Sequence, residues 1–234
     1  MRLDKYLADM SIGTRKEVKE IIKKGRVKVN DIIIKKADIK LNADDIVELD
    51  DEIIEYFEYE YYLLNKPSGY VTAREDDYHN VVMDLIISRR KDLAPVGRLD
   101  KDTEGVLLIT NDGVLNHRLL SSKYHVQKKY YVEVISPLDK NAKEIFSKPM
   151  EFSDFVANPA IYEAIGDYHA YITIEEGKYH QVKRMFAKIG SEVKYLRRET
   201  FGFLNVDDLK LGEYRALTKE EINKLYQIVG LEAK

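Results

Sequence analysis

The sequence predicts an α+β protein with two domains, a small one over residues 1–58 and a larger one over residues 59–234. The first observation behind this prediction is a change of pattern, because apolar residues at helical spacing open the chain and short strand-like runs follow them. The second is charge, since a basic zone, an acidic stretch and another basic zone follow one another along the chain. A chain of 234 residues can bury a sizeable core and form one or two domains.

Composition restricts the class of protein and its compartment. Charged residues make up 34% of the chain and no apolar run approaches the length of a membrane span, so we expect a soluble protein. The opening residues Met1–Lys5 carry charges of both signs and no apolar stretch, which argues against a signal peptide. The absence of cysteine excludes disulfides, thiolate nucleophiles and cysteine-based zinc sites. We therefore expect a cytoplasmic location and no membrane partner.

Lysine and arginine concentrate in two zones. Residues 14–28 hold seven of them, residues 41–65 hold none, and residues 178–198 hold seven against the single acid Glu192. Such a distribution is typical of two modules that bind one polyanion, although a solvated face on each helix gives the same pattern.

Two short helices are predicted at the start of the first domain. Their apolar positions at helical spacing are Leu3, Tyr6, Leu7, Val18, Ile21 and Ile22. Residues 11–13 interrupt the pattern, and the second helix begins after Thr14, because Thr14 and Glu17 have the spacing of a capping box. Gly25 ends this helix.

Three short strands are predicted next, over residues 26–29, 32–34 and 45–49. The pair Asn30-Asp31 predicts a tight turn between the first two. Residues 51–58 are acidic but include apolar side chains, and we interpret them as a linker.

The motifs RLDKYL, TRKEVKEIIKKGRVKVN and DIVEL, in this order over residues 1–50, resemble the S4 RNA-binding domain. In that family the second helix and the hairpin after it hold RNA phosphates. The resemblance implies this role for Arg2, Arg15, Lys16, Lys19, Arg26 and Lys28. Clustered cations bind phosphate chiefly by releasing counterions, and such contacts position RNA without specifying a base.

The second domain is expected to hold strands that alternate with polar loops. The predicted elements are a strand over 61–66 that continues through 70–72 after a turn at 67–69, a buried strand over 106–110 before a turn at 111–113, strands over 124–134 and 170–174, and a helix that begins within 176–186. In this helix Val182, Met185 and Phe186 are spaced for burial, which leaves Lys183 free to face elsewhere.

The loop before the buried strand carries the main candidate for catalysis. Asp100 follows Arg98 on a polar loop, and a rigid scaffold commonly presents a nucleophile in this way. A single loop aspartate more often bonds its own backbone, so the residue type alone does not decide. The whole run GRLDKDTEGVLLITNDG, however, resembles the catalytic motif of the pseudouridine synthases of the RsuA/RluA superfamily, on its RsuA side. The resemblance implies that Asp100 is the catalytic residue and that Arg98 fills the place vacated by the flipped base.

Further motifs extend this resemblance over nearly the whole chain. LLNKPSGYVTA resembles the family's first motif, and the strand after Tyr124 resembles its K-x-Y motif, with Lys128 and Tyr130 in the two places. A slip of one residue would put Tyr131 there and turn the side chain to the other face of the strand. An ordinary sheet tyrosine is the alternative for Tyr130.

The motif EGKYHQVKRM, with VKYLRRETFG after it, resembles the RsuA type and implies that Lys183 pairs with Asp100. An adjacent cation would keep Asp100 ionised and nucleophilic. The alternative for Lys183 is a surface lysine on an amphipathic helix. The same resemblance puts Lys128, His180 and Arg184 among the RNA-binding residues, and a metal-ligand role for His180 is disfavoured because no second histidine stands at ligand spacing.

Together these resemblances imply a catalytic domain with a mixed, mainly antiparallel sheet and a central cleft. The implied activity is isomerisation of a uridine to pseudouridine in small-subunit (16S) ribosomal RNA, at uridine 516 by resemblance alone. It requires the aspartate and neither a cofactor nor a metal. The carboxylate can add to the sugar, add to the base or stabilise a cationic sugar, and the sequence leaves these routes open.

We expect a monomer that binds ribosomal RNA. One alternative is a large-subunit synthase of the RluB/RluE/RluF type. The other is a non-catalytic S4-type RNA-binding or assembly factor, against which the joint presence of Arg98, Asp100, Tyr130 and Lys183 argues.

Overall fold

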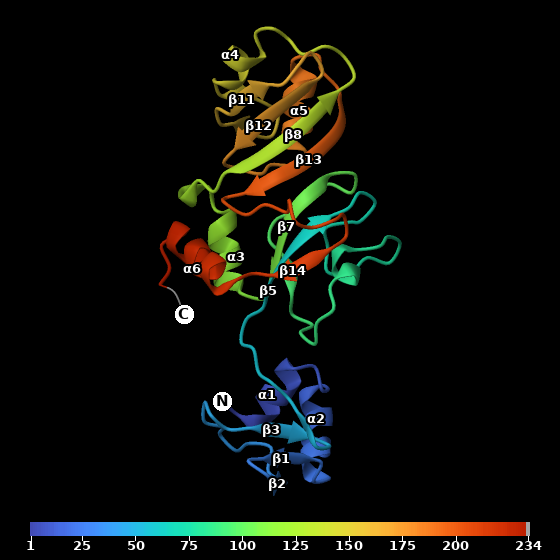
Figure 1. The fold of residues 1–234 in the computed structure, drawn as a ribbon, viewed down its shortest axis with the longest axis vertical. Coiled ribbons are helices and arrows are strands. Elements are labelled where there is room, and N and C mark those ends of the chain that lie inside the picture. The colour runs from blue at the N-terminus through green and yellow to red at the C-terminus, as the bar shows by residue number, and fades with distance from the viewer. Residues whose placement is uncertain (233–234) are drawn as a thin grey trace. The chain divides into compact units, whose positions relative to one another are not determined.

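A computed structural model describes residues 1–232 and divides the chain into two compact units (Figure 1). The smaller unit consists of residues 1–59 and 87–93, and the larger one of residues 60–86 and the chain from residue 94 onward. The sequence had assigned residues 87–93 to the larger domain. They belong to the smaller unit, where Arg90 donates to the Asp92 carboxylate and to the Phe57 carbonyl oxygen.

The smaller unit packs two helices on a four-stranded antiparallel sheet. The helices are α1 (Leu3–Asp9) and α2 (Arg15–Lys23), and the strands are β1 (Val27–Val29), β2 (Ile32–Ile34), β3 (Val47–Leu49) and β4 (Glu52–Ile53), in the order β2-β1-β3-β4. Leu3, Leu7, Val18 and Ile22 are fully buried in its core, which confirms the predicted helix faces.

Local signals fix the start of α2 and the β1–β2 turn as predicted. The Thr14 hydroxyl accepts from the Glu17 N–H at 3.3 Å, and the Thr14 N–H donates to the Glu17 carboxylate at 2.7 Å. Asn30 and Asp31 have φ values of 51° and 66°, the left-handed conformation that a two-residue hairpin turn requires.

The predicted linker over residues 51–58 is wrong in its first part. Asp50 and Asp51 form a second left-handed turn, with φ values of 50° and 68°, and return the chain as the edge strand β4. Ile54 then enters the core at 3% exposure. The acidic composition of this stretch concealed a hairpin, because its charged residues occupy the turn and the open edge.

The larger unit is built on one mixed sheet, which confirms the predicted α+β class. Its strands are β5 (Tyr61–Lys66), β6 (Ala94–Pro95), β7 (Glu104–Thr110), β8 (Lys128–Val134), β11 (Ile161–Ala164), β12 (His169–Ile174), β13 (Val193–Phe201) and β14 (Tyr214–Ala216). The order is β11-β12-β8-β13-β7-β5-β14, with β6 beside β7. Among the strands of the described residues, only β13 and β7 pair in parallel. A separate hairpin joins β9 (Met150–Glu151) and β10 (Val156–Ala157).

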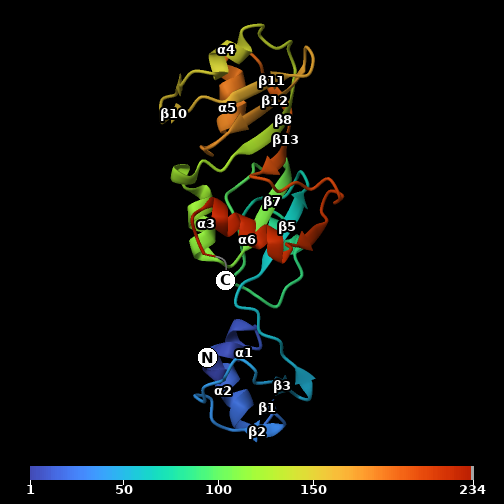
Figure 2. The ribbon, with the colours of Figure 1, turned by 60° about the vertical axis from the view of Figure 1, so that its left-hand side comes forward.

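Two pairs of helices pack against this sheet, one pair near β5 and β7 and the other near β11 and β13. α3 (Gly113–Leu120) and α6 (Lys219–Ile228) lie side by side near β5 and β7, and their Leu115, Leu119 and Leu225 share a core with Leu63 and Leu108 (Figure 2). α4 (Ala142–Phe146) packs by β11 and α5 (Gln181–Lys188) by β13. Within residues 1–232, none of the helices combines the length and the apolar character that crossing a membrane requires.

Two predicted strand boundaries need correction. Residues 70–72 do not continue β5, because Gly69 turns the chain with φ of 92° and Val71 forms only an isolated bridge with Val81. The strand expected from Tyr124 begins at Lys128, since residues 122–124 form the short 3-10 helix η2 and His125 has φ of 51°.

One predicted turn is instead a helix start, and one predicted helix start is confirmed. The turn expected at residues 111–113 is the start of α3, where the Asp112 carboxylate accepts from the N–H groups of Val114 and Leu115. The helix expected within 176–186 begins at Gln181.

The parallel contact between β7 and β13 depends on Gly105. This glycine has φ of 99°, and a Cβ built there would lie 2.1 Å from the carbonyl oxygen of Arg198. Only a residue without a side chain permits so close an approach. The contact brings the loop before β7 next to β13 and α5.

Candidate active site

The loop that carries Asp100 is clamped on its N-terminal side by Thr72. The buried Thr72 hydroxyl donates to the carbonyl oxygen of Leu99 at 2.7 Å and accepts from the N–H of Leu99 at 3.2 Å. Both backbone groups of the residue before Asp100 are thereby fixed.

Lys66 clamps the C-terminal side of the same loop. Its side chain is fully buried at the end of β5, and its ammonium donates to the carbonyl oxygens of Thr103 (2.7 Å), Pro67 (3.1 Å) and Lys101 (3.2 Å). Burial lowers the pKa of Lys66 to about 8, against the opposing attraction of Asp102 and other acids. Within residues 1–232 this buried amine makes no ion pair, and it holds the loop that carries Asp100 through carbonyl oxygens.

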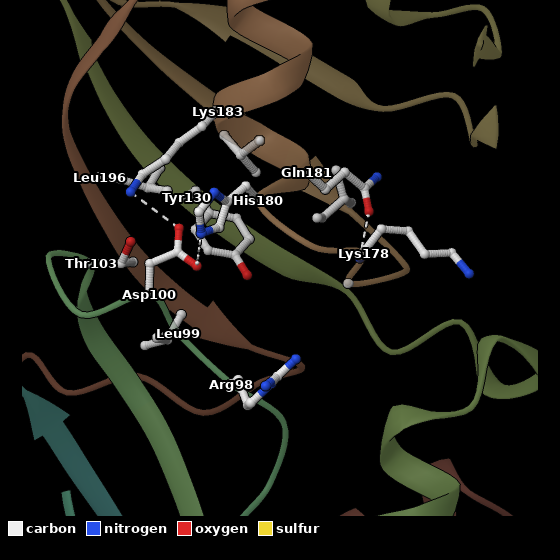
Figure 3. A pocket seen from close by; sticks show the side chains of 13 residues that line it. Arg98, Leu99, Asp100, Thr103, Tyr130, Lys178, His180, Gln181, Lys183 and Leu196 are labelled. Carbon is white, nitrogen blue, oxygen red and sulfur yellow. Dashed lines mark hydrogen bonds and ion pairs between the residues drawn. The ribbon is translucent and has the colours of Figure 1, made fainter. Parts of the chain in front are cut away.

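Helix α5 directs two side chains at Asp100 (Figure 3). Lys183 Nζ lies 3.1 Å from Asp100 Oδ2, and His180 Nε2 lies 3.4 Å from Asp100 Oδ1. The ion pair between Lys183 and Asp100 is therefore present as predicted. Lys183 Nζ also lies 2.6 Å from Asp102 Oδ1, a contact that the sequence analysis did not foresee.

The contact between Lys183 and Asp102 shifts the pKa of both side chains. Burial works against the charge of Lys183, but the hydrogen bonds with Asp102 and Asp100 outweigh it and raise the lysine pKa above its usual value. Burial likewise acts to raise the pKa of Asp102, and the hydrogen bond from Lys183 lowers it overall. The ammonium form of Lys183 is thus favoured throughout the physiological range.

His180 is the N-cap residue of α5 and has a strained backbone conformation. Its φ of 49° is left-handed, and its side chain makes no capping hydrogen bond. The ring instead faces Asp100 and stacks on Tyr179, with ring centroids 3.9 Å apart. Unfavourable backbone of this kind is often found at functional sites, where the surrounding structure holds it.

The structure decides between the two tyrosines of the K-x-Y motif. Tyr130 is 7% exposed and lines the cavity that also contains Asp100 and Lys183. Tyr131 points to the opposite face of β8, where its ring contacts those of Tyr171 and Tyr195. The two-residue alternation of β8 therefore gives the cleft position to Tyr130.

A second, larger cavity of about 680 Å³ adjoins Asp100. Arg98, Lys101, Lys128 and Tyr179 are among its lining residues. Its volume falls within the roughly 300–1,000 Å³ common for small-molecule sites.

Lys128 does not have the environment expected of a phosphate-binding cation. It is 5% exposed, and its ammonium donates to the carbonyl oxygens of Val126 (2.9 Å) and Glu175 (3.4 Å). Burial, with the nearby charge of Arg198, lowers its pKa to about 8. This lysine donates internally at the start of β8 and also lines the cavity beside Asp100, and its predicted role in RNA binding stays a prediction.

Arg184, also predicted to bind RNA, is engaged within the protein. Its guanidinium pairs with the Asp154 carboxylate at 2.5 Å and lies over the rings of Phe152 and Phe155. This cluster ties α5 to the β9–β10 hairpin, which lies on the same unit.

The predicted cations of the smaller unit separate into two groups. Arg2, Arg15 and Lys19 line a cavity of about 290 Å³ together with Lys5, which was not predicted, and Asp4, which accepts hydrogen bonds from Arg2. Lys16 is exposed on α2. Arg26 and Lys28 instead pair with Asp50 and Asp51 of the β3–β4 turn. Among the described residues, Arg15, Lys16 and Lys19 of α2 thus make no ion pair, whereas Arg2, like Arg26 and Lys28, is paired with a carboxylate of the protein.

Sequence reasoning missed Lys66, Thr72 and Asp102. The only signal for the first two was their place in the LLNKPSGYVTA motif, which predicts no contact with the loop. Asp102 stands two residues after the GRLD motif but looked like a loop residue bonded to its own backbone. Among residues 1–232, no group of three or more His, Cys, Asp and Glu side chains is arranged to hold a metal ion.

Comparison with known proteins agrees with this architecture. The profile of the RNA pseudouridylate synthase family matches residues 60–188, and that of the S4 domain matches residues 1–47. The chain therefore belongs to the RNA pseudouridylate synthase family, and it is an enzyme that carries an N-terminal S4 domain.

Relatives resemble the chain over nearly its full length. An uncharacterised RNA pseudouridine synthase of Bacillus subtilis is 42% identical, covering 96% of this chain and 98% of its own. The ribosomal small subunit pseudouridine synthase A of Vibrio cholerae is 39% identical (97% and 100% covered), and that of Escherichia coli is 38% identical (95% and 98%). A crystal structure of a pseudouridylate synthase superposes with a TM-score of 0.68 at 36% identity, covering 96% of this chain and 99% of the other.

Proposed function

We propose that this enzyme isomerises a uridine of small-subunit ribosomal RNA to pseudouridine, with Asp100 as its nucleophile. The observation that carries the proposal is the setting of Asp100, whose carboxylate faces the cleft between Lys183 and His180, beside Tyr130. Relatives named ribosomal small subunit pseudouridine synthase A, similar over almost the whole chain, support the choice of RNA. The family resemblance extends the proposal to uridine 516.

The chemistry requires that the base leave its sugar and return through another atom. A carboxylate can bond to C1′ of the ribose while the C1′–N1 bond breaks and its electron pair leaves with uracil. Alternatively, it can bond to C6 of the base while the C5=C6 π pair moves toward O4. In either route the negative charge passes from Asp100 to the uracil ring. Lys183 lies within ion-pair distance of this carboxylate before the step.

Rebonding at C5 leaves a proton on that carbon, which must be removed while N1 gains one. We assign a supporting role to Tyr130, which lies in the cavity with Asp100 and can stack on uracil and assist this transfer. The target must leave its stack to enter the cavity, and Arg98 on the rim can occupy the vacated place.

We further propose that the S4 domain holds phosphates of the same RNA through Arg15, Lys16 and Lys19 of α2. Asp100, Tyr130 and Lys183 all come from one chain, which supports action as a monomer. Because the chain belongs to the synthase family, we reject the alternative of a non-catalytic S4-type RNA-binding or assembly factor. A cytoplasmic location accords with a ribosomal substrate.

The decisive experiment measures tritium release from RNA labelled at uridine C5. Asp100→Asn preserves shape and removes only the charge, so we expect a loss of roughly 1,000-fold or more in rate with unchanged RNA affinity. Near-normal turnover by this variant would overturn the assignment. Pseudouridine mapping of small- and large-subunit RNA from a strain without the protein tests the substrate, and a lost modification in large-subunit RNA alone would favour the RluB/RluE/RluF type.

A further inference from the structure

We propose that Asp102 is a positioning residue that shares Lys183 with Asp100 and compensates the charge of the lysine while Asp100 is bonded to the substrate. The inference rests on the proposed function of Asp100. Its basis is geometric, because Lys183 Nζ is closer to Asp102 Oδ1, at 2.6 Å, than to Asp100 Oδ2, at 3.1 Å. One ammonium therefore bridges two carboxylates of the same loop.

The backbone holds Asp102 firmly in this position. Lys66 donates to the carbonyl oxygens of Lys101 and Thr103, the residues on either side of Asp102. The Thr103 N–H also donates to the Asp100 carbonyl oxygen at 3.1 Å, which closes a tight turn. Both carboxylates of this turn consequently meet the same ammonium on α5.

The two carboxylates differ in their access to a nucleotide. The Asp100 side chain is 27% exposed and lines both cavities of the site. The Asp102 side chain is 70% exposed and lines neither of these two cavities. Asp102 therefore stands outside the reaction space and reaches the reaction only through Lys183.

The charge balance of the reaction explains why a second carboxylate is useful. When an oxygen of Asp100 bonds to C1′ or C6, the displaced electron pair and the negative charge pass to uracil, and Asp100 becomes a neutral ester. Lys183 would then lose its counterion in a partly buried cleft, and an unpaired cation there is costly, the more so once RNA displaces water. Asp102 retains the charge until C5 bonds to C1′ and the carboxylate of Asp100 forms again.

The test compares variants in single-turnover tritium release with saturating enzyme. Asp102→Asn should slow this step roughly 10- to 100-fold, because the lysine loses its second anchor. RNA affinity should stay within about twofold or tighten slightly, since a negative charge is removed near phosphate. Asp102→Glu should recover most of the rate, because it keeps the charge. As a matched control, Glu133→Gln breaks the exposed pair of Glu133 with Lys194 on β8 and should leave the rate unchanged.

A double-mutant cycle distinguishes action through Lys183 from a merely structural role. In a Lys183→Met background, Asp102→Asn should cause no further loss, because the group it acts on is gone. Equal losses in both backgrounds would overturn the inference, as would a normal rate for Asp102→Asn. These failures differ from failure of the proposed function, in which the wild-type protein releases no tritium or Asp100→Asn remains active.

Discussion

The two basic helices of this chain look alike in sequence but use their charge differently. On α2, Lys16, Lys19 and Lys23 make no ion pair among the described residues. On α5, Lys183 and Arg184 face carboxylates from other elements of the same unit. A cation without a protein partner is available to phosphate, whereas a cation already paired organises the protein around it. The difference shows that a basic stretch indicates a binding surface only once its partners are known.

The first turns of α2 and α5 also differ, since one is satisfied locally and the other is not. Thr14 and Glu17 cap α2 reciprocally, so its first turn is satisfied by local hydrogen bonds. The first turn of α5 has no side-chain cap, because His180 faces Asp100 instead. Helix α2 is thus built for stability, and the start of α5 gives up stability to form the site.

Removing one charge from each helix tests whether the cations of α2 and α5 differ in their effect on the reaction. Lys183→Met should reduce the single-turnover rate roughly 100-fold or more, because Asp100 and Asp102 lose the ammonium that contacts both carboxylates. Lys183→Arg should retain more activity, since it keeps the charge in a different geometry. Lys23→Met on α2 serves as the control and should leave the chemical step unchanged at saturating RNA. Equal rates for Lys183→Met and Lys23→Met would show that α5 is only a solvated helix.

Lys66 extends the comparison to a cation held by carbonyl groups alone. Lys66→Met should lower the free energy of unfolding by about 1–3 kcal/mol at pH 7, because three carbonyl oxygens lose a donor. The folded pKa of about 8 lies below that of a free lysine, so the unfolded chain binds more protons between about pH 8 and 10.5. The stability of the wild type relative to Lys66→Met should therefore rise with pH across this window. Urea unfolding at several pH values measures it, and a difference that falls with pH would contradict the burial argument.

The free and paired cations of the S4 domain should differ in their salt dependence. The double variant Lys16→Ala, Lys19→Ala should reduce the slope of log affinity against log salt by about 1.4–1.8, as two phosphate contacts disappear. The matched variant Arg26→Ala, Lys28→Ala should change the slope less, because Asp50 and Asp51 already neutralise these side chains. RNA titrations between low and moderate salt give both slopes. The comparison fails if the second pair of substitutions has the larger effect.

The smallest expected effect concerns the helix starts. Thr14→Ala should lower the free energy of unfolding by about 1 kcal/mol through loss of the cap, without altering the chemical step. His180→Ala should do the reverse, leaving stability nearly unchanged and slowing the reaction by about fivefold, because Asp100 loses one partly exposed polar contact. Thermal unfolding and single-turnover rates together check this, and a loss of stability in His180→Ala equal to that in Thr14→Ala would remove the distinction.

The features of this protein that depend on local signals could be predicted from the sequence. Periodicity and capping predicted α1 and α2, the turn at Asn30 and Asp31, the buried strand β7 and the inward face of α5. The GRLD motif placed Asp100 on a loop before that strand. These signals suffice because each is decided by residues within a few positions of one another.

Which charged side chains contact one another could be seen only in the tertiary structure. The parallel approach of β7 and β13 at Gly105 brings the Asp100 loop to α5, so Lys183 contacts both Asp100 and Asp102. Because side chains alternate along β8, Tyr130 lines the cleft and Tyr131 does not. Lys66 and Lys128 are buried in the fold and donate hydrogen bonds to backbone carbonyl groups. Whether a charged side chain faces water, a carboxylate or a carbonyl group depends on segments far away in the chain, which no local pattern specifies.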